Sequence, residues 1–162
     1  MSSTDQRIRK THHSVYAISY HLVFVVKYRK PVLTPEMGDY MESIARRRLK
    51  ANGGGLISLK TDRDHVHLLI ELKPTDAPSR AAGSLKTQFS KELHQHFGHE
   101  IALQLKGSTL WSASYFIATT GGVTLETLEK YVASQQTEAH HRKYISRGRY
   151  GKKRNLRPKP EE

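Results

Sequence analysis

The sequence predicts an α+β domain: a ferredoxin-like, RRM-like split β-α-β-β-α-β antiparallel sheet, followed by an added C-terminal helix that carries Tyr131. Two observations predict this fold class. Four short stretches are rich in β-branched and aromatic residues, as strands are. Two longer stretches, one after the first strand and one after the third, repeat apolar residues every three or four positions, as amphipathic helices do. The order of these elements defines the fold.

The first half of the domain contains three predicted strands and one helix. Residues 16–26, YAISYHLVFVV, have the composition of a central strand, and two prolines follow it. Residues 35–51 carry apolar residues at a spacing of three and four, and the sequence NGGG ends this helix. Residues 56–61, LISLKT, form the second strand, and after a tight turn residues 63–72, RDHVHLLIEL, form the third.

The second half contains a helix, a strand and the added helix. Residues 79–97 form an amphipathic helix, and residues 108–120 have the composition of a fourth strand. The added helix follows Gly121 and Gly122, with Thr124 as its predicted N-cap. In this topology the first and third strands are central, and both earlier helices cover one sheet face. The other face is therefore free to meet a substrate.

Composition limits the class of protein. The chain has 162 residues, enough for one domain with a core, and a formal net charge of +12, which favours nucleic acid as a partner. We expect a basic N-terminal extension over residues 1–14, the catalytic domain over 15–138 and a basic, flexible tail over 139–162. The absence of cysteine excludes thiolate chemistry. With no bilayer-spanning apolar run and no signal peptide, we expect a cytoplasmic protein without a membrane partner.

Two histidine pairs have the spacing His-x-His, and the predicted backbone separates them. His65 and His67 lie on a strand, so their side chains share a face with Cα atoms about 7 Å apart and can converge on one cation. His94 and His96 lie on a helix, where residues two apart do not share a face. We therefore interpret the first pair as a candidate metal site and the second as helix surface.

Tyr131 and Gln135 are four residues apart on the added helix and therefore project from the same helix face. A tyrosine on such a helix is more often a half-buried packing residue than a nucleophile, and an exposed glutamine is common. Spacing alone therefore does not assign a role to either residue.

Four segments together are more informative: YHLVFVVKYRKPVL, DHVHLLIEL, LWSASYFIATTGG and LEKYVASQ. In this order and spacing they resemble the small single-tyrosine HUH transposases of the simplest bacterial and archaeal insertion sequences. The resemblance covers about residues 16–137. A strand with His-hydrophobe-His, combined with a later helix with Tyr-x-x-x-Gln, is specific to that family, although neither half is specific alone.

The resemblance implies that His65, His67 and Gln135 bind a divalent metal ion, Mg²⁺ or Mn²⁺. It further implies that Tyr131 attacks a phosphodiester of single-stranded DNA and forms a 5′-phosphotyrosine. These groups suit the chemistry, because a metal polarises the scissile phosphate while a phenol requires activation. Asp64 matches a common residue of the family motif, but its opposite strand parity argues against a role as ligand.

The resemblance also implies a homodimer with composite sites, in which the histidines of one chain act with Tyr131 of the other. Gly121 and Gly122 would form the hinge that lets the helix reach the partner subunit. Family members bind DNA hairpins at the ends of their elements. Three basic residues would then contact the DNA backbone: Lys27, Arg29 and Lys86.

Three alternative functions remain open on the sequence alone. A housekeeping relative would process repeated genomic hairpins instead of moving its own element. A non-catalytic RRM-like module would share the topology, although the aromatic RNP motif is missing from the third strand. A metal-dependent hydrolase would use water as the nucleophile and leave Tyr131 with a structural role.

Overall fold

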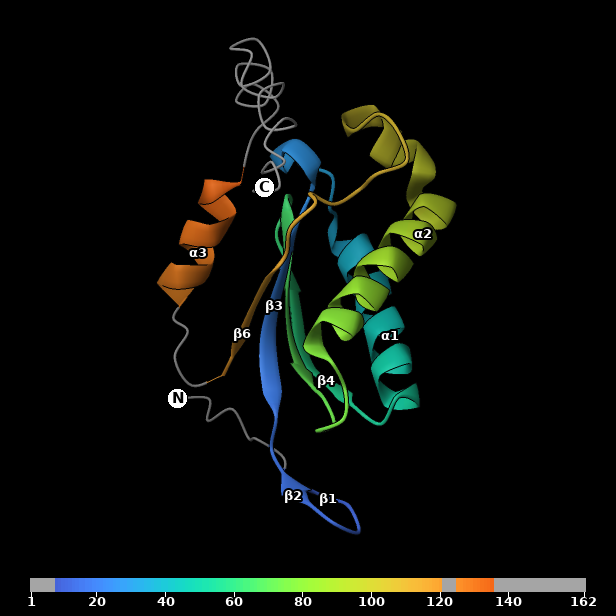
Figure 1. The fold of residues 1–162 in the computed structure, drawn as a ribbon. Coiled ribbons are helices and arrows are strands. Elements are labelled where there is room, and N and C mark those ends of the chain that lie inside the picture. Colours follow the sequence, from blue (N-terminus) through green and yellow to red (C-terminus); the bar gives the residue numbers. More distant parts are fainter. Residues whose placement is uncertain (1–7, 121–124, 136–162) are drawn as a thin grey trace, which may run out of the picture.

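A computed structural model describes residues 8–120 and 125–135 of the chain. The elements are β1 (Arg9–Lys10), β2 (Val15–Tyr16), β3 (Ser19–Val25), the 3-10 turn η1 (Lys27–Arg29), α1 (Pro35–Ala51), β4 (Gly55–Thr61), β5 (His65–Glu71), α2 (Pro78–Gln104), β6 (Phe116–Thr119) and α3 (Leu125–Ser134). Strands β3 to β6 form an antiparallel sheet in the order β4-β5-β3-β6. The predicted fold class is therefore confirmed, with the first and third of these strands, β3 and β5, at the centre (Figure 1).

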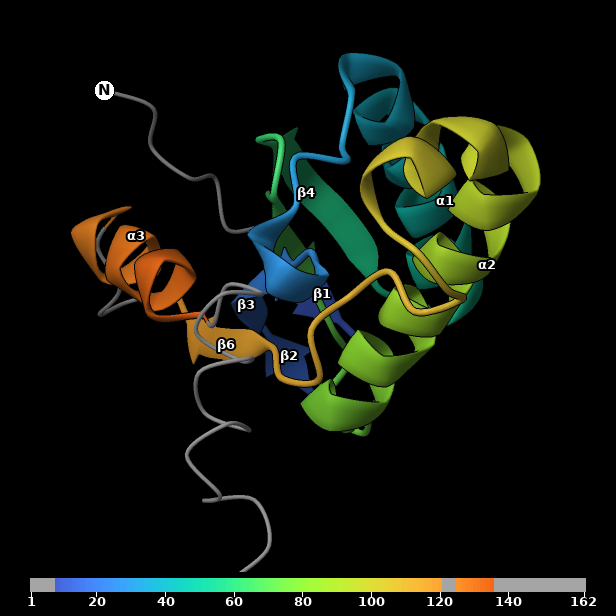
Figure 2. The same ribbon diagram turned by 90° about the horizontal axis from the view of Figure 1, so that it is seen from above.

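The sheet separates two packing layers. Helices α1 and α2 cover one face, and α3 lies on the other side of the sheet (Figure 1, Figure 2). Strand β3 serves both layers because its side chains alternate: Leu22 and Phe24 are fully buried in the main core, whereas Val23 and Val25 pack with Val132 of α3. Helix α3 therefore covers part of the face that the split topology leaves free.

Helix α1 begins and ends at the predicted residues. The Thr34 hydroxyl accepts a hydrogen bond from the Met37 amide at 3.2 Å, and Pro35 occupies the first turn. At the other end, the Gly53 amide donates to the Lys50 carbonyl and the Gly54 amide donates to the Leu49 carbonyl. This is a Schellman motif, and it requires the left-handed φ of +78° that glycine supplies at position 53.

Helix α2 is longer than the predicted 79–97. It has one non-helical residue, Phe97, at φ −128° and ψ 23°, and then continues to Gln104. The prediction was wrong at this end, because Ile101 continues the four-residue apolar spacing of Leu93 and Phe97 and is only 1% exposed. Burial of that side chain stabilises the added turns.

The fourth strand is shorter than the predicted 108–120, because only Phe116–Thr119 pairs with β3 as a strand. Within residues 108–115, which the structure describes in full, the only strand-like pairing is an isolated bridge between Trp111 and Val26. The strand-like composition was misleading here, because the carbonyls of residues 112–114 accept hydrogen bonds from a lysine side chain instead of a neighbouring strand.

The first predicted strand, 16–26, is divided into β2 and β3. Strands β1 and β2 form a separate two-stranded hairpin, which Arg9 joins to the main sheet through a 2.7 Å ion pair with Glu71. Part of the predicted extension over residues 1–14 therefore contacts the domain. The glycines at 121 and 122, the predicted N-cap at 124 and the tail over 139–162 lie outside the described residues. Within those residues, every helix is too short or too polar to cross a bilayer.

Candidate functional site

His65 and His67 lie on β5, on the sheet face opposite α1 and α2. Across the sheet His65 pairs with Val25 and His67 pairs with Val23, the two valines that contact α3. Residues that lie directly opposite each other on neighbouring strands have side chains on the same face of the sheet. The histidines therefore lie on the face that carries α3.

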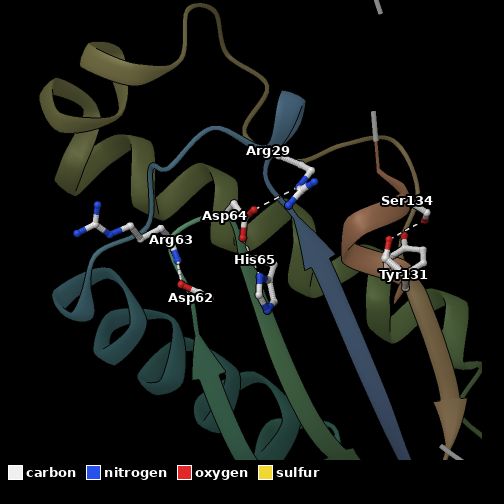
Figure 3. Close-up of polar contacts among 7 residues, drawn as sticks. All are labelled: Arg29, Asp62, Arg63, Asp64, His65, Tyr131 and Ser134. Atoms are coloured by element: carbon white, nitrogen blue, oxygen red, sulfur yellow. Dashed lines mark hydrogen bonds and ion pairs between the residues drawn. The ribbon is translucent and has the colours of Figure 1, made fainter. Parts of the chain in front are cut away.

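Asp64 orients His65. The His65 Nδ1–H donates to the Asp64 carboxylate at 2.8 Å, and Arg29 pairs with the other oxygen of the same carboxylate at 3.4 Å (Figure 3). Because a carboxylate only accepts, the proton of a neutral His65 lies on Nδ1 and leaves a lone pair on Nε2. This arrangement is typical of histidines that bind metals. Asp62, Asp64 and His65 also offer donor atoms within 4.8 Å of one another.

A third histidine lies beside His67. His21 Nδ1 and His67 Nε2 are 2.9 Å apart, with the rings stacked at a centroid distance of 5.1 Å. Burial, followed by the charges of His21, His65 and Lys60, lowers the pKa of His67 to about 4. Burial also lowers the pKa of His21. Both imidazoles are therefore neutral near pH 7, which is the form that coordinates metals.

A cavity of about 150 Å³ lies between the histidines and α3. Its lining residues are Val23, Arg29, His65 and His67 on the sheet side and Glu129, Val132 and Ala133 on α3.

Tyr131 and Gln135 make their contacts on a different side of α3 from the residues that line the cavity. The Tyr131 ring packs on Phe116 of β6 at 5.2 Å, and its hydroxyl lies 3.0 Å from Ser114 Oγ. Ser114 Oγ also donates to Gln135 Oε1 at 3.2 Å. Phe116 and His67 both pair with Val23, so two strand spacings, about 10 Å, separate their backbones. The structure therefore brings Tyr131 and Gln135 together, but on Ser114 and not on the histidines.

The three predicted DNA contacts differ in their surroundings. Lys27 lies over the Tyr28 ring, with 5.2 Å between Nζ and the ring centroid. Arg29 has a left-handed φ of 53° and faces the site through its ion pair with Asp64. Lys86 instead directs its ammonium at the carbonyls of residues 112, 113 and 114, at 2.8, 3.4 and 3.3 Å. Burial lowers the pKa of Lys86. The Lys86 ammonium therefore has local partners in these carbonyls.

The other histidine pair lies on α2, which packs on the opposite face of the sheet (Figure 2). His94 Nδ1 donates to the Ser90 carbonyl at 2.7 Å, and the His96 ring packs against Tyr40 at 4.5 Å. These two imidazoles therefore have separate local partners.

The sequence interpretation missed two residues, His21 and Ser114. A signal for His21 existed, because it has the same strand parity as Val23 and Val25, but identifying it requires the register between β3 and β5. Ser114 gave no signal, since it lies within the stretch expected to be a plain strand.

Comparison with known proteins shows the family of the chain. Residues 14–135 match the family model of IS200-like transposases. The ISDra2 transposase TnpA of Deinococcus radiodurans is 33% identical over 128 residues, which cover 79% of this chain and 91% of the relative. The transposase for insertion sequence element IS200 of Salmonella typhimurium is 27% identical over 126 residues, covering 78% and 82%.

A solved structure is similar as well. The crystal structure of a candidate transposase from Deinococcus radiodurans R1 superposes with a TM-score of 0.72 at 29% identity, covering 80% of this chain and 99% of that one. The chain therefore belongs to the IS200-like transposases, the single-tyrosine HUH family that its motifs resemble. Its reaction class is the cleavage and joining of DNA.

Proposed function

We propose that this transposase is metal-dependent, acts on single-stranded DNA, and nicks and rejoins its substrate through a 5′-phosphotyrosine on Tyr131, with DNA hairpins at element ends as its recognition sites. The observation that carries this proposal is the position of His65 and His67 on the sheet face that α3, the helix of Tyr131, partly covers. The family match supports it, because transposition requires strand cleavage and joining.

The proposed metal ligands are His65, His67 and Gln135. The donor chemistry fits a divalent ion, because His67 is neutral and His65 has a carboxylate partner on Nδ1. When bound, Mg²⁺ or Mn²⁺ would polarise the scissile phosphate and withdraw charge from it. Gln135 supplies an amide oxygen, which must first leave Ser114.

Tyr131 is the proposed nucleophile. Its phenol has an ordinary pKa of about 10 and must lose its proton to attack. As the bond from the phenolic oxygen to phosphorus forms, the bond from phosphorus to the 3′ oxygen breaks, and that oxygen leaves and takes up a proton. The 5′ phosphate then remains on Tyr131, so a later 3′ hydroxyl can reverse the step and rejoin a strand without a nucleotide cofactor.

The basic residues near the site have different proposed roles. Lys27 and Arg29 lie in η1, directly after β3, and Arg29 lines the cavity beside the histidines. Both suit contacts to phosphates, which position DNA without reading its sequence. The contacts of Lys86 favour a role in holding residues 112–114, in place of the direct DNA contact expected from the sequence.

A direct test is to incubate the protein with Mg²⁺ and a single-stranded oligonucleotide that carries the hairpin from the flank of its gene. A covalent protein-DNA adduct that survives denaturing electrophoresis is expected, together with a free 3′ hydroxyl on the released strand. A hydrolase that uses water would cleave the same strand without leaving an adduct.

We further expect a homodimer in which Tyr131 acts on the partner's histidines, with Gly121 and Gly122 as the hinge. This expectation is supported by the contacts of α3, because Tyr131 bonds to Ser114 while Glu129, Val132 and Ala133 face the histidines of the same chain.

Mixing two inactive variants tests this arrangement. A Tyr131→Phe subunit mixed with a His65→Ala, His67→Ala subunit is expected to regain about one quarter of wild-type cleavage after random exchange, because each heterodimer has one intact composite site. Cleavage is measured before and after exchange, which is followed with subunits of different mass. Exchanged dimers that stay inactive would show that each tyrosine serves its own chain.

A further inference from the structure

Ser114 contacts both Tyr131 and Gln135, the two residues of α3 with proposed roles in the reaction. We propose that Ser114 is a positioning residue that holds Tyr131 and Gln135 in a resting position, from which both must be released before cleavage. This inference rests on the proposed roles of Tyr131 and Gln135, but the contact itself belongs to the fold.

The hydrogen bonds have a defined direction. Ser114 has one hydroxyl proton, which it donates to Gln135 Oε1 at 3.2 Å. The contact of 3.0 Å with Tyr131 must therefore use the tyrosine proton, so the phenol donates to Ser114 Oγ. In this chain of bonds the nucleophile keeps its proton directed at Ser114, and the amide oxygen proposed for the metal accepts a different partner.

The orientation of α3 agrees with a resting position. Tyr131 and Gln135 are four residues apart and share one side of the helix. Another side carries Glu129, Val132 and Ala133, which line the cavity beside His65 and His67. A reaction at the histidines of either chain therefore requires α3 to rotate or to leave Ser114.

Lys86 makes Ser114 a fixed anchor. The Lys86 ammonium has three protons and bonds to three successive carbonyls, those of residues 112, 113 and 114. In return, the Trp111 indole donates to the Lys86 carbonyl at 3.1 Å. Because Trp111 is only 5% exposed, this segment is held on α2 from both ends.

Helix α3, on the other side of this contact, is held less firmly than Ser114. The contacts of α3 include its bonds to Ser114 and its packing on Val23, Val25 and Phe116. Ser114 is exposed, and a net hydrogen bond changes an equilibrium by roughly 2- to 12-fold. The contact is therefore strong enough to set the position of α3 and weak enough for a bound DNA strand to displace.

Amide hydrogen exchange of the full chain tests the anchor without relying on catalysis. Ser114→Ala is expected to raise the exchange rate of the α3 amides by roughly 2- to 12-fold for each lost bond, with exchange in β3 and β5 unchanged. Ser114→Thr keeps the hydroxyl and should restore wild-type exchange. Ser112→Ala is the matched control, because its buried hydroxyl has no hydrogen-bond partner within the described residues. Unchanged α3 exchange in Ser114→Ala would overturn the proposal.

Single-turnover cleavage of a hairpin oligonucleotide is the second measurement. If Ser114 holds α3 in a resting position, Ser114→Ala should cleave at or above the wild-type rate, with DNA affinity unchanged. A tenfold loss of rate at unchanged affinity would instead mean that Ser114 assists the reacting tyrosine, and would overturn the resting role. Failure of the proposed function would give a different result. A covalent adduct formed by Tyr131→Phe would show that Tyr131 is not the nucleophile. The hydrogen-exchange data would still test whether Ser114 holds α3.

Discussion

Replacing Tyr131 with phenylalanine is expected to abolish DNA cleavage, with a loss of at least about 10³-fold, because the substitution removes the proposed nucleophilic oxygen and nothing else of the ring. The ring contact with Phe116 at 5.2 Å should persist, so α3 keeps its apolar packing. Hairpin binding should be unchanged, since the proposed phosphate contacts, Lys27 and Arg29, are other side chains. Cleavage and adduct formation are measured on denaturing gels, and affinity by a filter or mobility-shift assay at fixed salt.

A neighbouring tyrosine supplies the control for that substitution. Tyr115 is half-buried, and its ring packs edge-on against Phe24 at 6.5 Å in the main core, on the far side of the sheet from α3. Tyr115→Phe should therefore cleave at the wild-type rate. A covalent adduct formed by Tyr131→Phe would contradict the assignment of the nucleophile.

Removing either strand histidine is expected to have the second large effect. His65→Ala and His67→Ala should each lose metal-dependent cleavage and weaken Mn²⁺ binding, measured by calorimetry or by the electron paramagnetic resonance signal of free Mn²⁺. Removing even the hydrogen-bond partner of a metal ligand lowers metal affinity or activity by about 10- to 100-fold, so loss of a proposed ligand should cost at least as much. Chelation of the metal should abolish wild-type cleavage. The fold should stay intact, because His65 and His67 are not part of the main hydrophobic core.

The helix pair supplies the control for the histidines. His94→Ala and His96→Ala remove imidazoles of the same type from α2, where the partners are the Ser90 carbonyl and the Tyr40 ring. Both variants should keep metal binding and cleavage. An equal loss from both pairs would mean that histidine substitution acts through stability, which thermal unfolding of the four variants would reveal.

The fold could be predicted well wherever local pattern and tertiary packing agree. Helix α1 is an example, since its cap, its apolar spacing and its terminal glycines all specify residues 35–51. The stretch 108–120 is the opposite case. Its β-branched and aromatic residues are typical of a strand, but the decisive partner is the Lys86 side chain, which is more than twenty residues away in sequence and occupies the carbonyls of residues 112–114.

The candidate site could be predicted only within one element at a time. Strand parity placed His65 and His67 on one face, and helix spacing placed Tyr131 with Gln135. Parity also led to Asp64 being set aside, but Asp64 precedes the first residue of β5, so the rule for alternating faces does not apply to it. Its carboxylate contacts His65 directly.

Contacts between different helices and strands could not be predicted from patterns within one segment. The pairing of His21 with His67 joins residues 46 positions apart, and Ser114 meets Gln135 across 21 positions. Both contacts depend on strand register or on how α3 docks. No periodicity within a single segment carries that information.

The three carbonyls around the Lys86 ammonium also limit how this segment can diverge. An inserted or deleted residue between Trp111 and Ser114 would shift every later backbone group by one position, so that Lys86 could no longer bind all three carbonyls while Ser114 met α3. These contacts therefore fix the length of the segment, and an engineered insertion that preserves them belongs outside residues 111–114.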